Sequence, residues 1–279
     1  MSPDLLAVLI GMGSAVVYGG ADFMGGFSAR RAVPIMVVIC SQCVGVLTLL
    51  ALSPLAGEPA PTAACLLWAA AAGISGGLGL IAFYRGLSLS MGLVAPVASV
   101  LMALVPVLAA LWIEGAPSGT QIAGFALAIP ATWLVTRTNT NGQAAVRPLG
   151  LAVIAGVLFG LFMVCFERAS SETVFLPLAA ARVVSIATLT SIALITRQAQ
   201  VPPRSAWPSI ALTGVLDTGG NALFALAAQT GRLDVAAVLA SLAPAFTVLL
   251  AWQVLREHIS PAQWLGIVGA LAAIALIAL

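Results

Sequence analysis

Two charged residues lie inside apolar stretches of the sequence, where a charge is costly. Asp217 is halfway along one apolar run, and Arg182 is about a third of the way into the run before it. A charged side chain near the middle of a bilayer costs about 2.5–3.5 kcal/mol or more, so neither residue is expected to face lipid. Thr213, Asp217 and Asn221 recur at every fourth residue, which places them in one stripe of a helix. This stripe and Arg182 could contact a substrate or a coupling proton; the alternative is a structural ion pair between neighbouring helices.

Polar residues and prolines in other apolar runs are further candidates. A proline inside a membrane helix frees a backbone carbonyl that protein or cavity water must satisfy, although a simple packing kink explains it equally well. Tyr84 could contact a solute through its ring or anchor the chain at the membrane interface. The expected solute contacts besides the charged residues are Tyr84, Ser99 and Ser241, and the expected helix kinks are Pro96, Pro106 and Pro244.

Enzymatic chemistry finds little support in the residues. The segment "GISGG" around Ser75 matches a nucleophile motif, but a nucleophile elbow requires a strand-to-helix turn, and a protease would need a histidine near Ser75. The sole histidine, His258, lies in a distant polar turn. Cys40 and Cys43 are too few for a zinc site, which takes about four ligands. We therefore expect no enzyme, no metal and no cofactor.

Composition places the chain in a membrane. Only 7% of its 279 residues are charged and 61% are hydrophobic, whereas soluble domains carry roughly 25% charged residues. A net charge of +2 offers no basic face for nucleic acid. The apolar runs are continuous, as in membrane helices of about 20 residues, and the first is expected to stay rather than be removed as a signal peptide. We predict an all-α protein with ten spans at 4–27, 34–53, 62–86, 92–113, 119–136, 149–166, 175–196, 206–229, 234–255 and 260–279.

The two halves of the sequence resemble each other. A long polar break at 137–148 separates five predicted spans from five, and residues 95–124 align with 237–266. In a neighbouring register, Gly73 and Gly79 match Gly214 and Gly220. An odd number of spans makes the second copy enter the membrane from the opposite side. Such inverted repeats, here 1–142 and 143–279, are typical of alternating-access transporters with a substrate site near the midplane.

The same comparison aligns two further acidic residues, Asp22 and Glu167, late in the first and sixth spans. Inversion would place them near opposite membrane faces. They could act as paired gates or a proton relay; the alternative is interfacial capping beside Arg30, Arg31 or Arg168. Acidic residues in turns, such as Glu257, are expected to be solvated.

The stretches "FYRGLSLSMGLVAPVASVLMALVPVLAAL" and "GVLDTGGNALFALAAQTGRLDVAAVLASLAPAFTVLLAWQVLREHISPAQWLGIVGALAAI" resemble the two repeats of an EamA-type member of the drug/metabolite transporter superfamily. "GGADFMGGFSARR" fits as well, and Arg256 stands where the family usually has glycine. The resemblance implies ten helices and a solute carrier, commonly an exporter of amino acids, metabolites or drugs.

Together these observations predict a secondary transporter in the cell (inner) membrane. It would export small metabolites, such as amino acids or drug-like solutes, by alternating access. A lipid or lipid-linked-sugar flippase and a non-transporting scaffold stay open as alternatives. Protons could be the coupling ion, and the chain could act as a monomer or a homodimer.

The orientation in the membrane is ambiguous. Most arginines fall in the turns after spans 1, 3, 5, 7 and 9, and the positive-inside rule then places both termini outside. The family resemblance favours both termini inside.

Overall fold

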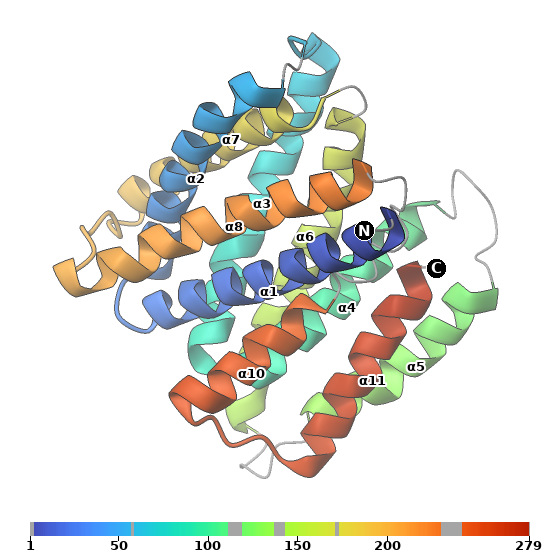
Figure 1. Cartoon of the computed structure of the whole chain (residues 1–279). Coiled ribbons are helices and arrows are strands. Elements are labelled where there is room, and N and C mark those ends of the chain that lie inside the picture. Colours follow the sequence, from blue (N-terminus) through green and yellow to red (C-terminus); the bar gives the residue numbers. More distant parts are fainter. Residues whose placement is uncertain are drawn as a thin grey trace.

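The computed structural model describes residues 3–56, 59–110, 119–136, 143–170, 173–229 and 242–278. Within these residues every regular element is helical (Figure 1). The helices are α1 (Pro3–Ala29), α2 (Pro34–Ala56), α3 (Ala63–Leu89), α4 (Met91–Ala110), α5 (Gly119–Thr136), α6 (Gln143–Ala169), α7 (Phe175–Ile195), the short 3-10 helix η1 (Arg204–Ala206), α8 (Trp207–Gln229), α10 (Ala243–Leu255) and α11 (Pro261–Ala278).

The predicted apolar runs coincide with these helices. Of the ninth run, 234–255, only 243–255 is described as helix, and the remainder lies outside the described residues. The sixth run begins earlier than expected, because α6 starts at Gln143 and includes Pro148, which the sequence had suggested as part of a break. Pro148 lies beyond the first turn of this helix, so the hydrogen bond that a backbone N–H at this position would donate to the carbonyl of residue 144 is missing.

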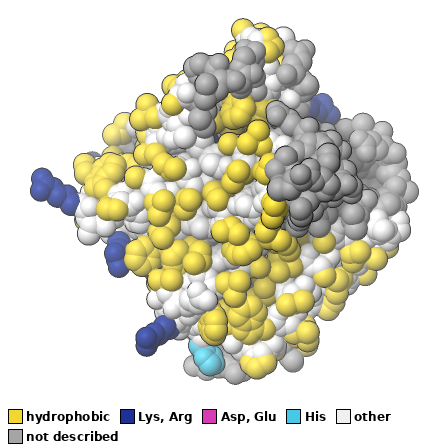
Figure 2. Space-filling model, in the orientation of Figure 1, with side chains coloured by type: hydrophobic (Ala, Val, Ile, Leu, Met, Phe, Trp, Pro, Cys, Tyr) yellow, Lys and Arg dark blue, Asp and Glu magenta, His cyan; other side chains and the backbone are white. Residues whose placement is uncertain are grey.

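Several helices have the length and composition of membrane spans. By those criteria four segments of the described chain could cross a membrane, namely Pro34–Ala51, Ala63–Leu89, Val146–Phe166 and Phe175–Ile195. Large apolar side chains such as Leu67 and Ile129 are about three-quarters exposed, and apolar side chains cover much of the surface in Figure 2. An apolar exterior is expected where lipid replaces water.

Helix directions follow from the residues that touch. Helix α1 runs antiparallel to α8, because the Ser14 hydroxyl donates to the Gly220 carbonyl while the Ser28 hydroxyl donates to Ser209. Helix α3 likewise runs antiparallel to α6, since Gly76 lies against Phe162 near one end of the pair and Gly86 lies near Leu151 at the other. In Figure 1, α1 lies beside α8, and α5 lies beside α11.

The same kind of packing occurs twice, and each time it joins a helix of the first half of the chain to a helix of the second half. Gly73 of α3 lies against the Ala181 carbonyl of α7, and Gly214 of α8 lies against the Ser41 carbonyl of α2. The contact of α3 with α6 thus corresponds to that of α8 with α1, and the contact of α3 with α7 corresponds to that of α8 with α2. Glycine is needed at these positions because a Cβ there would collide with backbone of the neighbouring helix.

One end of the bundle carries most of the arginines, and we call it the basic face. It contains the turns α1–α2, α3–α4 and α10–α11, the α7–α8 connection and the start of α6. Its arginines are Arg30, Arg31, Arg85, Arg147, Arg197, Arg204 and Arg256. In Figure 2, most of the dark blue side chains that are visible lie at the left and lower left. The marked chain ends lie toward the other side of the bundle in Figure 1.

The main apolar core lies toward the basic face. It packs the late residues of α1, α3 and α10 against the early residues of α2, α4 and α8. Leu87, Met91 and Val94 are fully buried within it. Smaller clusters, such as Leu49 with Leu178, lie toward the opposite end. The bundle is therefore densely closed on its basic face.

Candidate functional site: a charge pair between helices

The two charges that the sequence places inside apolar runs form an ion pair. The Arg182 guanidinium of α7 donates from its NH2 to the Asp217 Oδ2 of α8. The Arg182 side chain is only 9% exposed, whereas that of Asp217 is 33% exposed although it lies in mid-helix. The carboxylate is therefore partly accessible from outside the protein, whereas the guanidinium is enclosed by it.

Small residues make room for this pair. A Cβ at Gly45 of α2 would collide with the Arg182 guanidinium and lie 3.0 Å from the Thr218 hydroxyl. Thr218 itself donates to the Gly45 carbonyl at 3.5 Å. Glycine at position 45 thus lets a bulky cation sit between α2, α7 and α8. This requirement comes from a contact between helices and is not evident in the sequence around Gly45.

The rest of the predicted polar stripe is satisfied within its own helix. The Asn221 amide donates to the Asp217 backbone carbonyl at 2.7 Å, and the Thr213 hydroxyl donates to the Ser209 carbonyl at 2.8 Å. Around the pair, in contrast, buried polar atoms lack a hydrogen-bond partner within the described part of the chain. They include Arg182 Nε, Ser185 Oγ and Gln42 Oε1. Buried polar atoms without partners are uncommon, and a site that receives a polar ligand is one explanation.

A second carboxylate and two tyrosines lie near the pair. Tyr18, Asp22 and Gly25 share one face of α1 because they are four and three residues apart. The Tyr18 ring rests on Gly220 of α8, and the Tyr84 ring of α3 rests on Gly25. The charges of Asp217 and Asp22 are close enough to act on each other and on both tyrosines. Tyr84 and Asp22 were predicted as site residues; Tyr18 was missed, and its only sequence signal is its spacing from Asp22.

Asp22 has no ion-pair or hydrogen-bond partner among the residues that the structure describes. The arginines expected to cap it are engaged elsewhere: Arg30 pairs with Glu257, and Arg31 lies over the Phe27 ring at 4.2 Å from its centroid. No interfacial cap of Asp22 by these two arginines is present among the described residues. The side chain of Glu167 lies outside the described residues.

The remaining predicted residues are not brought to the pair by any contact in the described structure. Ser99 donates to the Ala95 carbonyl of its own helix at 2.9 Å. Pro96 is buried within a continuous α4, and the side chain of Pro106 and all of Ser241 lie outside the described residues. Pro244 occupies the first turn of α10, where its missing N–H needs no partner, and the residues before 242 that a kink would involve lie outside the described residues.

Ser75 and Glu257 lie elsewhere in the structure, and only Glu257 differs from its expected surroundings. The Ser75 hydroxyl donates to the Ala71 and Ala72 carbonyls of its own helix, so it is held by backbone. Glu257, expected to be solvated, accepts from the Arg30 guanidinium and from the backbone N–H groups of Met91 and Gly92.

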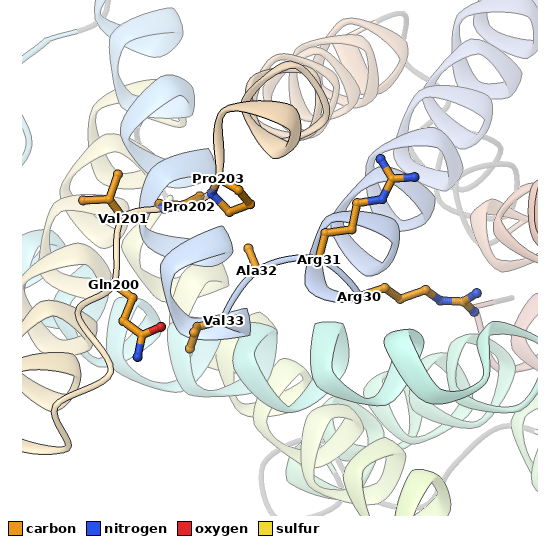
Figure 3. A pocket seen from close by; sticks show the side chains of 8 residues that line it. All are labelled: Arg30, Arg31, Ala32, Val33, Gln200, Val201, Pro202 and Pro203. Atoms are coloured by element: carbon orange, nitrogen blue, oxygen red, sulfur yellow. The ribbon is translucent and has the colours of Figure 1, made fainter.

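A pocket of about 350 Å³ opens at the basic face, away from the charge pair (Figure 3). It lies between the α1–α2 turn and residues 200–203. Arg30 and Arg31 extend away from Gln200 and Val201 in Figure 3, so their charged ends do not converge on the opposite wall. The pocket therefore presents a solute with fewer converging charged groups than the Arg182–Asp217 pair does.

Comparison with known proteins now adds to the geometry. Residues 147–279 match the model of the EamA-like transporter family. The second half of the chain belongs to this family. The resemblance seen in the sequence is thereby confirmed for this half, and together with the apolar helices the match indicates a multi-pass membrane protein.

A solved crystal structure shares the fold. It aligns over 97% of this chain and 95% of its own chain with a TM-score of 0.66 and 16% sequence identity. At that identity the likeness concerns the fold alone. No curated protein matches the sequence.

Proposed function

We propose that this EamA-like protein is a secondary transporter that exports a small polar solute, such as an amino acid or a drug-like molecule, across the cell (inner) membrane. One observation carries the proposal: Asp217 is reachable at mid-helix while its partner Arg182 is buried. A purely structural ion pair would be better shielded on both sides, because each exposed polar surface in an apolar bundle is costly. The solute would contact Asp217, Arg182 and Asn221, with Tyr18 and Tyr84 as neighbouring aromatic walls.

The route across the membrane is proposed to be alternating access between two inverted repeats, 1–142 and 143–279. Two features support this proposal. First, helices at equivalent positions of the two halves make equivalent contacts. Second, α1 and α6 run in opposite directions. Helices α1 and α3 contact each other through their late residues, so they run the same way, and α3 is antiparallel to α6. Transporters of this architecture bind their substrate where the repeats meet.

Asp22 is the proposed proton carrier. It is a carboxylate inside an apolar helix, without a cation of its own among the described residues, and the charge of Asp217 on α8 acts on it. Tyr18 of α1 and Tyr84 of α3 lie within range of both carboxylates and of Arg182 on α7. Two carboxylates beside one guanidinium leave one negative charge, which a proton or a cationic group of the solute can neutralise. Proton uptake and solute binding would then compete for the same site.

We propose an orientation in the membrane from the basic face, as the arginine count in the sequence favours. The positive-inside rule places that face in the cytoplasm, and the chain ends on the other side. A C-terminal tag should then react with a membrane-impermeant reagent in intact cells. Reaction only after permeabilisation would reverse this orientation and leave the site itself unaffected.

The function is tested with purified protein. A thermal-shift screen of small metabolites should find solutes that raise the apparent melting temperature of the wild type, because a ligand of the folded state stabilises it. The same solutes should accumulate in, or exchange across, liposomes containing the protein. The matched control is Asp217→Asn, which should lose the thermal shift and the transport together. If no hit from the screen is transported by the wild type, the proposal fails.

A further inference from the structure

The α10–α11 turn of the second half contacts the α1–α2 turn and the start of α4 in the first half. Arg256, in a left-handed backbone conformation with φ of 54°, ends α10 and is followed by Glu257. The Glu257 carboxylate then pairs with Arg30 of the α1–α2 turn and accepts the backbone N–H groups of Met91 (3.2 Å) and Gly92 (3.3 Å) at the start of α4. Ile259 lies next to Gly92.

This contact combines three favourable electrostatic effects. The first backbone N–H groups of α4 have no partner within the helix, and the positive end of its dipole attracts an anion. The guanidinium adds a charge-assisted hydrogen bond. Because the side chains of Arg30 and Glu257 are only 30% and 19% exposed, solvent screens their attraction incompletely.

The contact also stands at the closed end of the bundle. Directly inside it lie Leu87 and Met91, both fully buried in the main apolar core. Gly26 of α1 packs against the same two side chains, and Tyr84 lies one turn before Leu87 on α3. A solute that reached Asp217 from the basic face would have to part these residues.

We propose that Glu257 is a latch that holds the basic face closed, and that the solute site becomes accessible from this face when the carboxylate leaves Arg30 and the start of α4. The helices joined are α1 and α4 of the first half and α10 and α11 of the second, so the latch opposes movement between the halves. This inference rests on the proposed alternating access, but its test needs neither a solute nor transport.

The test is the reactivity of a buried cysteine. In the full-length protein with Cys40, Cys43, Cys65 and Cys165 replaced by alanine, Leu87→Cys places a thiol beneath the latch. A charged maleimide should label it slowly in purified protein. Glu257→Ala should raise the labelling rate about tenfold or more, which corresponds to about 1.4 kcal/mol of opening. Arg30→Gln should raise it less, because the α4 cap stays, and Glu257→Gln should be intermediate, because its amide oxygen can still accept from Met91 and Gly92.

Two controls separate an opened latch from general loosening. Leu49→Cys, 1% exposed in the cluster with Leu178 toward the opposite end, should keep its labelling rate in every latch variant. Arg204→Gln removes an exposed cation from the same face and should change neither rate. Unchanged labelling of the Leu87 cysteine in Glu257→Ala, or an equal rise at both cysteines, would overturn the latch. If Glu257→Ala does not fold, the same two criteria apply to Glu257→Gln and Arg30→Gln.

A failed transport assay leaves this measurement intact, and an unchanged labelling rate leaves the charge pair intact. The two proposals can therefore fail separately.

Discussion

Asp217→Asn is expected to abolish transport and to lower the free energy of unfolding moderately. The size of that loss depends on the unequal exposure of Asp217 and Arg182. Removing one partner of a fully buried ion pair costs about 3–5 kcal/mol. Here the stranded group would be Arg182, whose side chain is 9% exposed. The asparagine oxygen can still accept from its NH2, so a neutral hydrogen bond replaces a charged one, and we expect a loss of about 1–3 kcal/mol. Asp217→Ala, which removes the acceptor entirely, should approach the upper limit of 3–5 kcal/mol.

Removing the cation instead of the carboxylate should lower the free energy of unfolding less. Arg182→Gln leaves a carboxylate that is 33% exposed and therefore less strongly desolvated than the guanidinium. The loss of stability should therefore increase in the order Arg182→Gln, Asp217→Asn, Asp217→Ala. The double variant Arg182→Gln/Asp217→Asn has no stranded charge, and it should regain stability without regaining transport.

The assay pairs thermal unfolding in detergent with uptake into liposomes on the same preparations. A structural pair predicts that the double variant recovers stability and transport together, whereas a solute site predicts recovery of stability alone. A normally folded and fully active Asp217→Asn protein would remove the residue from the mechanism. Equal losses for Arg182→Gln and Asp217→Ala would refute the argument from unequal exposure.

Three further variants test other parts of the structure. Gly220→Ala places a methyl group 2.7 Å from Tyr18 Cδ1 and should destabilise the protein by about 1–3 kcal/mol in thermal unfolding. The control Gly219→Ala, whose methyl group would lie 3.7 Å from Val17, should be close to neutral. Similar losses of stability in the two variants would contradict the packing of Tyr18 on Gly220. Asp22→Asn should fold normally and transport with little dependence on pH, and a retained pH profile would exclude it as the proton carrier. Ser75→Ala should leave transport nearly intact, because its hydroxyl only binds its own helix; the selective loss of a hydrolytic reaction would instead indicate an enzyme.

The sequence predicts the helices and the charge pair for the same physical reason. A run of about 20 apolar residues forms a helix in a membrane because its backbone hydrogen bonds must be made internally. A charge within such a run must then find a partner in the protein. Arg182 and Asp217 satisfied both conditions, since each stands in one of two consecutive runs, and the structure pairs them.

Contacts between distant segments could not be predicted in this way. Arg30 and Glu257 are separated by 227 positions, and each lies in a polar turn where solvation is the ordinary expectation. Tyr18 lies in an apolar run, as many core aromatic residues do. Only the contact of its ring with Gly220 of a distant helix identifies it as a neighbour of the charge pair. A proline such as Pro244 is compatible with either a kink or a helix start, and the sequence alone does not place the boundary of α10 that lies beside it.

On the proposed repeat, the scaffold is shared by the two halves but the charges are not. The matched contacts Gly73 with Ala181 and Gly214 with Ser41 align Gln42 with Arg182, and Gly76 with Asp217. Gln42 is buried like Arg182, but it is neutral, and Phe162 packs against Gly76 where an acidic side chain would need space. A second charge pair would require two more desolvated ions in an apolar bundle, each at a cost of several kcal/mol. Their summed cost would be on the order of the whole free energy of unfolding of a domain. One pair is sufficient if a single site is exposed to each side of the membrane in turn. Alternating access thus accounts for both features, a duplicated packing that can move and a chemistry that occurs once.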